Sequence, residues 1–197
     1  MCPRIGLDVP TILQAAAEIA DVHGVDAITL ASLAKKLDVR PPSLYNHIDG
    51  LHGLRKKLSI YGLEQLYSIM TQVAVGRSGD EAVRALGEAY VTFARTHPGL
   101  YEAALVGPDL RDPDVQRAGN QIVDLLLRVL GAYDLGDEAA LHVVRGLRSI
   151  FHGFASLEQQ GGFQLRLDRD VSLRLLIDTY LAGIRSMHGR IHEINNR

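Results

Sequence analysis

Residues 29–48, TLASLAKKLDVRPPSLYNHI, predict two short helices joined by a tight turn. Thr29 suits the N-cap of the first helix, because its hydroxyl can accept a hydrogen bond from a first-turn backbone N–H. The apolar residues that follow have helical spacing: Leu30, Leu33, Ala34 and Leu37. Asp38 stands where the turn needs a left-handed residue, which Asp tolerates better than most residues. Pro41 and Pro42 suit the start of the second helix, where a missing N–H costs little.

The second predicted helix combines one apolar anchor with polar and aromatic groups. Leu44 is the anchor, and Ser43, Tyr45, Asn46 and His47 lie beside it in the sequence. A helix-turn-helix of this kind places its second helix in the major groove of DNA. The alternative is a purely structural helix pair, which would not need this ordered set of residues.

The stretch resembles the DNA-binding domain of the TetR family of bacterial repressors. The resemblance starts at the preceding helix, residues 10–23, which Gly24 follows, and continues through residue 48. It implies that the start and outer face of the second helix contact bases, while the Tyr and the His contact phosphates. The residues predicted to contact double-stranded operator DNA are Thr29, Arg40, Pro41, Ser43, Leu44, Tyr45, Asn46, His47, His52 and Lys56.

The chemistry of these side chains suits the predicted contacts. Arg40 can pair with guanine and Asn46 with adenine, whereas Tyr, Ser and His side chains can hold phosphate. Thr29, at a helix N-terminus, is also placed for a phosphate contact. For Tyr45 the alternative is packing against the helix of residues 10–23.

Two features of residues 1–75 depart from the usual pattern. This stretch has seven Lys or Arg and seven Asp or Glu, so it lacks the basic balance typical of DNA-binding domains. Neutrality weakens non-specific affinity more than it excludes specific binding. Family members often place a Lys at the start of the next helix, where this chain has Leu51. Either His52 or Lys56 replaces that phosphate contact, or the contact is missing.

Composition predicts an all-α protein. The 197 residues are 47% hydrophobic, with no Trp, few aromatic residues and long Leu, Ala and Val periodicities. Cys2 is the single cysteine and cannot form an internal disulfide, which indicates a reducing compartment. No apolar run approaches the roughly 20 residues that span a bilayer, and the N-terminus lacks a signal-peptide core. We therefore expect a cytoplasmic protein that does not associate with membranes.

Glycine and proline positions divide the chain. Three parts are predicted: a helix-turn-helix domain at 1–50, a connecting helix at 51–75, and an effector-binding and dimerisation domain at 80–197. Residues 76–80, GRSGD, form the linker. Helices of the third part are expected near 81–97, 100–105, 113–131, 137–160 and 169–188.

The helices at 137–160 and 169–188 predict a homodimer. The first is apolar on more than one side, and a helix with one wet face does not need two apolar stripes. Leaving the second stripe in water would expose a larger apolar patch than monomers usually tolerate. A two-fold four-helix bundle would cover it, as the family resemblance also implies. The predicted interface residues are Leu147, Ile150, Leu176, Tyr180 and Ile184.

Residues 147–163, LRSIFHGFASLEQQGGF, resemble the C-terminal ligand-binding domain of one TetR subgroup, named for a Trp-His-Gly signature. Here the signature positions are Phe151, His152 and Gly153. His152 is expected to be either a hydrogen-bonded core histidine or a polar group in a pocket. The residues predicted to line a pocket for an unidentified small-molecule effector, of apolar or aromatic character, are Tyr90, Phe93, Tyr101, Phe151, His152 and Phe154.

Catalytic, cofactor and metal sites are not predicted. The sequence has no Gly-rich phosphate loop, nucleophile elbow or zinc-type Cys/His spacing. His188 and His192 have the spacing of two ligands on a helix, but no third ligand is evident. We expect a TetR-type transcriptional regulator, a repressor that a small effector releases from its operator. The alternative is a helical dimerisation or adaptor protein without sequence-specific DNA binding.

Overall fold

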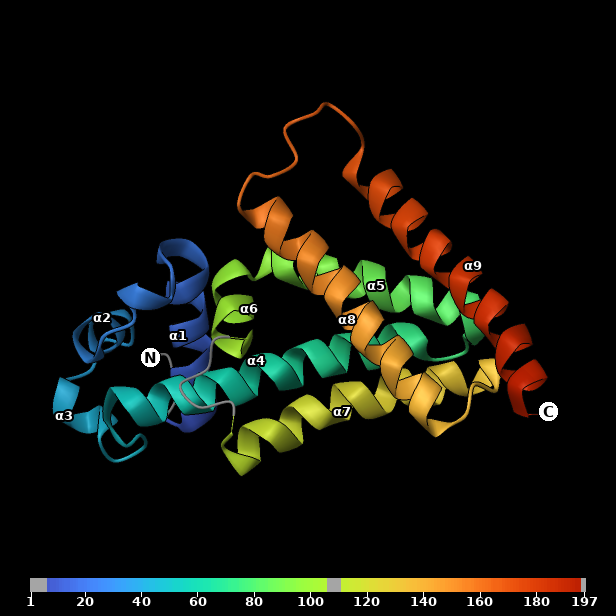
Figure 1. Cartoon of the computed structure of the whole chain (residues 1–197). Helices are drawn as coiled ribbons and strands as arrows, with labels where there is room; N and C mark the ends of the chain where they lie inside the picture. The colour runs from blue at the N-terminus through green and yellow to red at the C-terminus, as the bar shows by residue number, and fades with distance from the viewer. Residues whose placement is uncertain (1–6, 106–110, 196–197) are drawn as a thin grey trace. The chain divides into compact units, whose positions relative to one another are not determined.

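The computed structural model describes the backbone of residues 7–105 and 111–195, and the side chains of residues 7–105 and 111–186. Every regular element in these ranges is a helix (Figure 1), which confirms the predicted all-α fold. None of these helices is both long enough and apolar enough to cross a membrane.

The chain forms two compact units, and each takes two segments of the sequence. The first unit consists of residues 1–65 and 96–118, and the second of residues 66–95 and 119–197. This division differs from the predicted parts, because residues 96–118 group with the N-terminal segment. The helix α4, Gly50–Ala74, begins in the first unit and ends in the second.

The first unit contains the predicted helix-turn-helix. Its elements are α1 (Val9–His23), the 3₁₀ turn η1 (Val25–Ala27), α2 (Leu30–Lys36), α3 (Pro41–Leu44), the start of α4, α6 (Pro98–Leu105) and the start of α7 (Pro113–Leu130). The Asp8 carboxylate caps α1 by accepting a hydrogen bond from the Thr11 N–H at 2.9 Å. Gly24 ends the helix at φ 83°, a conformation that suits glycine.

A reciprocal capping box starts α2. The Thr29 hydroxyl accepts from the Ser32 N–H at 3.0 Å, and the Ser32 hydroxyl accepts from the Thr29 N–H at 2.9 Å. Asp38 has φ 52°, so the predicted left-handed residue of the turn is confirmed. The helix α3 is shorter than predicted: residues 45–47 continue as a hydrogen-bonded turn, with the His47 N–H donating to the Leu44 carbonyl at 2.9 Å.

The short helix α6 packs closely on both α1 and α4 (Figure 1). A Cβ added to Gly99 would lie 2.1 Å from the backbone carbonyl of Ala20 in α1. A Cβ added to Gly62 of α4 would lie 2.9 Å from the Ala104 Cβ and 3.0 Å from the Leu100 carbonyl oxygen. Glycine is therefore needed at both contacts, and α6 is part of the body that carries the helix-turn-helix.

The second unit is a helical bundle around an aromatic and aliphatic core. Its elements are the end of α4, α5 (Gly79–Thr96), the end of α7, the 3₁₀ turn η2 (Gly131–Tyr133), α8 (Asp137–Gln159) and α9 (Arg169–Asn195). The predicted helix at 169–188 is confirmed as α9, but α9 continues to Asn195. Side chains from every helix of this unit contribute to the core, among them Met70, Leu86, Phe93, Leu126, Phe151 and Ile177.

Candidate DNA interface and effector region

The side chains around α3 form an exposed polar surface, which we call the recognition surface. Its members are Arg40, Ser43, Tyr45, Asn46 and His47. Arg40 and Asn46 are exposed, and Ser43 and His47 are half-buried. Tyr45 is 59% exposed, so most of it faces solvent and it is not buried against α1, which was the alternative. The structure therefore leaves these five residues, all within 40–47, at least partly accessible to solvent.

Leu44 is a correction to the predicted DNA contacts. Its side chain is completely buried, together with those of Leu33 and Ile48. An apolar group on a four-residue helix must face the core if the polar groups beside it are to face water. Leu44 therefore anchors α3 and presents its neighbours, but it has no exposed side-chain surface. Pro41 and Thr29 are exposed, as a phosphate or sugar contact requires.

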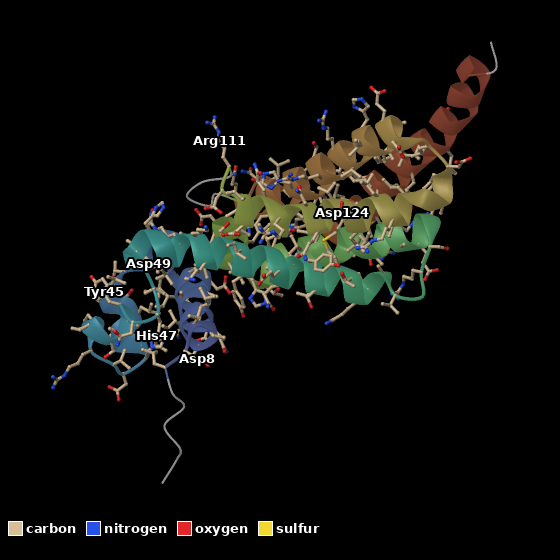
Figure 2. All side chains as sticks on the ribbon, turned by 90° about the horizontal axis from the view of Figure 1, so that it is seen from below. Asp8, Tyr45, His47, Asp49, Arg111 and Asp124 are labelled. Carbon is tan, nitrogen blue, oxygen red and sulfur yellow. The ribbon has the colours of Figure 1, made fainter. Side chains whose placement is uncertain are left out.

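His47 lies near the start of α1. Figure 2 shows Tyr45 and His47 at the same end of this unit as Asp8. The pKa of Asp8 lies below its ordinary value, mainly because of the hydrogen bond from Thr11, and the charge of His47 adds to the effect. The N-cap of α1 therefore lies close to the recognition surface.

Lys56 is placed differently from the prediction. Its ammonium group lies 2.6 Å from Asp112 and 3.0 Å from Asp114, at the start of α7. The hydrogen bonds to these carboxylates raise the pKa of Lys56, and the same bond lowers the pKa of Asp112. The Lys56 ammonium group, which was predicted to contact a phosphate, is thus already paired with two carboxylates. His52 is exposed and remains the candidate for that contact.

Four of the residues predicted to line the effector pocket lie in the core of the second unit. They are Tyr90, Phe93, Phe151 and Phe154, and all four are buried. The Tyr90 and Phe151 rings are 5.8 Å apart, and a Cβ added to Gly87 would lie 2.6 Å from the Phe151 ring. Packing around Phe151 is therefore tight.

The other two predicted pocket residues lie elsewhere. Tyr101 is buried in α6 and belongs to the first unit. His152 is exposed on α8, so in a single chain it is neither a core histidine nor an enclosed pocket group. The α-helical period explains this position, because Phe151 faces the core and the next residue is turned about 100° away.

Two surface hollows can be described among the residues of the second unit whose side chains are placed, and neither of these two includes a predicted pocket residue. One, of about 160 Å³, is lined by the connection between α8 and α9, including Phe163, Leu165 and Leu167. The other, of about 380 Å³, is lined by residues near η2, including Leu130, Asp134 and Leu141. The first hollow lies mainly in a segment for which the sequence predicts no helix, whereas Leu130 and Leu141 of the second lie in the helices predicted at 113–131 and 137–160.

Two of the predicted interface residues are corrections. Leu147 and Ile184 are buried inside one chain and have no surface for a partner. Ile150 and Tyr180 are half-buried, and the Tyr180 hydroxyl donates to the Val143 carbonyl at 3.2 Å. Leu176 is 40% exposed.

Most of the apolar side chains that are exposed on α8, α9 and their connection are not among the predicted interface residues. The exposed residues are Leu141, Leu157, Leu165, Leu167, Val171, Leu175 and Leu176, and we call this set of exposed side chains, which are spread over both helices and their connection, the apolar surface. The helix surface is also uncovered at Gly153 of α8 and at Gly183 of α9, since a Cβ added to either would meet no described heavy atom within 4 Å. An apolar surface on two adjacent helices is what a helix-helix contact requires.

A polar network joins three segments of the second unit. The Asp80 carboxylate at the start of α5 accepts from the Tyr133 hydroxyl at 2.6 Å and is paired with Arg185 of α9. Arg84 lies 3.6 Å from Asp80 and 2.5 Å from Asp178. Partial burial would raise the pKa of Asp80, but the Tyr133 hydrogen bond and the two cations outweigh it, so this pKa is lowered. Partial burial raises the pKa of the Tyr133 hydroxyl above its ordinary value, and the hydrogen bond to Asp80 raises it further.

The described side chains include no group of three or more His, Cys, Asp or Glu that could hold a metal ion. The side chains of His188 and His192 lie outside the described residues.

Comparisons with known proteins agree with the all-α fold. Residues 83–180 match the tetracyclin repressor-like C-terminal domain. The chain is 44% identical to an uncharacterized HTH-type transcriptional regulator of Bacillus subtilis, YobS, over 93% of this chain and 96% of that protein. In fold it is similar to a Rhodococcus protein of unknown function (TM-score 0.80, 23% identity, 93% and 98% of the two chains). It is also similar to TetR from Acinetobacter baumannii in complex with minocycline (TM-score 0.69, 20% identity, 93% and 99%). The chain therefore belongs to the TetR family of DNA-binding transcriptional regulators.

Proposed function

We propose that this regulator is a repressor, that it binds its operator as a homodimer, and that a small-molecule effector releases it. The observation that carries the proposal is the recognition surface, where a buried Leu44 presents exposed Arg40, Tyr45 and Asn46. A helical adaptor would have no reason to expose this set of groups.

The residues of the recognition surface have different roles in the proposal. Arg40 and Asn46 contact base edges, since guanine and adenine offer each of them a bidentate partner. Tyr45, His47 and Ser43 contact phosphates and fix the register on the duplex. His52 takes the phosphate contact at the start of α4, because Lys56 is held by two carboxylates.

The second copy in the homodimer covers the apolar surface. Leu175 and Leu176 of α9 are 62% and 40% exposed, which is more than a core position allows. Gly183 lets the helices of two copies approach closely. Operator half-sites about 34–36 Å apart then meet two recognition surfaces.

The effector in this proposal is apolar or aromatic and binds in the second unit, where the buried, tightly packed side chains of Tyr90, Phe93, Phe151 and Phe154 must separate to admit it. An effector that favours a dimer with a different spacing of recognition surfaces releases the operator. The likeness in fold to a TetR structure that contains minocycline supports a small-molecule effector. The Phe151-His152-Gly153 signature supports membership of the Trp-His-Gly subgroup, with Phe in place of Trp.

Fluorescence anisotropy with duplex DNA from the protein's own promoter region tests the proposal. The wild-type chain should bind a specific site, and the Tyr45→Ala/His47→Ala double variant should bind it no better than random DNA. Arg128→Ala, an exposed cation of the second unit, should bind like wild type. If the double variant keeps the affinity and salt dependence of the wild type, the recognition surface is wrongly assigned.

Sedimentation tests the dimer. Leu176→Glu places a charge in the apolar surface and should convert the protein into monomers that bind operator weakly. Val22→Glu is the matched control, since Val22 is exposed on α1 of the first unit and its variant should stay dimeric. A wild-type chain that sediments as a monomer at micromolar concentration would refute the paired arrangement.

A further inference from the structure

We propose that Asp21 is a positioning residue for operator binding. It lies in the last turn of α1, outside the recognition surface, and it caps α6 from a different helix. Its role is to hold α1 in a fixed position on α6, so that the recognition surfaces keep the spacing that the operator requires. The inference rests on the proposed binding of paired half-sites.

Both carboxylate oxygens of Asp21 are used. One accepts a hydrogen bond from the Leu100 N–H at 2.9 Å, and the other lies 3.0 Å from His97 Nδ1. Leu100 is the third residue of α6, so its N–H is one of those that a helix leaves without an internal partner. The residues that usually cap a helix precede it directly in the sequence. Here the cap comes from 79 residues away, so it also links two helices.

The surroundings of Asp21 allow little adjustment. Its side chain is only 17% exposed. The neighbouring Ala20 is buried, and its carbonyl touches the backbone of Gly99. Since backbone meets backbone, no side chain can reorient to take up a change. If α1 tilted or slid on α6, the helix cap and the close contact would be lost together.

The position of α1 matters for DNA because the helix-turn-helix is built on it. α1 buries Ile12, Ala16 and Ile19 within the first unit, and its N-cap lies near His47. On its other side α6 is held against α4 at Gly62. A dimer binds two half-sites more tightly if its helix-turn-helix segments are already held in the arrangement that the operator requires. Any ordering that takes place only on binding lowers the affinity. A loose joint between α1 and α6 would therefore weaken paired binding more than binding to one half-site.

The test compares three duplexes: the operator, a single half-site, and operators whose half-sites are moved by one or two base pairs. Asp21→Ala should bind the operator about tenfold more weakly, roughly the effect of a lost helix cap. It should bind the single half-site as wild type does, and should discriminate less between half-site spacings. Asp21→Asn should be intermediate, because its amide oxygen can still accept from Leu100.

Asp26→Ala is the matched control, since Asp26 is a nearby, fully exposed acid. Circular dichroism and sedimentation establish that each variant is folded and dimeric. If both Asp21 variants keep the operator affinity and spacing preference of the wild type, the inference is overturned. Equal losses on the operator and the single half-site would also overturn it, since they would mean general support of the helix-turn-helix. If the wild-type chain binds no duplex, the proposed function itself fails.

Discussion

Replacing Gly99 by Ala tests the close contact between α1 and α6. The new Cβ would start 2.1 Å from the Ala20 carbonyl and 2.6 Å from the Asp21 backbone nitrogen. Ordinary contact begins near 3.4 Å, so the helices would have to separate by roughly 1.3 Å. The atoms in the way belong to the backbone of a buried helix segment, which cannot rotate aside as a side chain can.

The expected loss follows from three terms. Overpacking of this kind costs about 1–3 kcal/mol. Separation also weakens the hydrogen bond from Leu100 to the Asp21 carboxylate, and a bond to a charged group contributes about 1.5–3 kcal/mol. The lower entropy of the unfolded chain with Ala returns about 0.5–1 kcal/mol. We expect Gly99→Ala to lower the free energy of unfolding by about 2–4 kcal/mol.

Urea denaturation followed by circular dichroism measures this loss. All variants are compared at one protomer concentration, since the stability of a dimer depends on it. Gly119→Ala in α7 is the matched control: its Cβ meets no described heavy atom within 4 Å, so this variant should be more stable by about 0.5–1 kcal/mol. If Gly99→Ala is as stable as wild type with an unchanged m-value, the packing argument is wrong.

Three further predictions concern other parts of the chain. Leu44→Ala should lower the free energy of unfolding in urea by about 2–5 kcal/mol, because it empties a fully buried site; a loss below about 1 kcal/mol would contradict the anchor role. Lys56→Gln should lower the melting temperature in dilute buffer, and the difference should shrink towards 1 M salt, where ion pairs are screened. The pKa of Asp80 is lower in the folded protein than in the unfolded chain, where it is about 3.9. Ionised Asp80 therefore stabilises the fold fully above about pH 3.9, and this stabilisation is lost as the pH falls through the pKa of the folded protein. The stability difference between wild type and Asp80→Asn should therefore be constant near neutral pH and decrease at acid pH; a difference that grows with acidification would contradict this linkage.

Local signals in the sequence predicted most helices to within about two residues. Proline at the start of α7 and glycine after α1 mark boundaries by backbone chemistry alone, which needs no tertiary information. The left-handed Asp38 could be predicted for the same reason. The exposed groups around α3 were also predictable, because an amphipathic pattern determines which side faces water.

Contacts between distant segments could not be predicted in this way. Periodicity shows that α8 has two apolar sides, but it does not show which side faces its own core, so Leu147 was assigned to the wrong side. The carboxylates that hold Lys56 come from 58 residues away, and no local pattern reports them. The same limit hid the grouping of α6 with α1, whose contacts include the hydrogen bond between Asp21 and Leu100.

The order of segments in the first unit restricts how such a chain can be cut or recombined. Because residues 96–118 return to the unit that contains residues 1–65, no single cut separates a complete DNA-binding body from the rest. A fragment that stops after α4 would expose to water the backbone of Ala20 and the side of α4 at Gly62, both of which α6 contacts. A hybrid that joins this N-terminal segment to a relative's effector domain would receive a foreign α6. The hybrid would fold correctly only if the foreign helix had a glycine where Gly99 contacts Ala20 and a backbone N–H where Leu100 donates to Asp21. Whether the parts of two regulators are compatible should therefore depend on a few residues of α6.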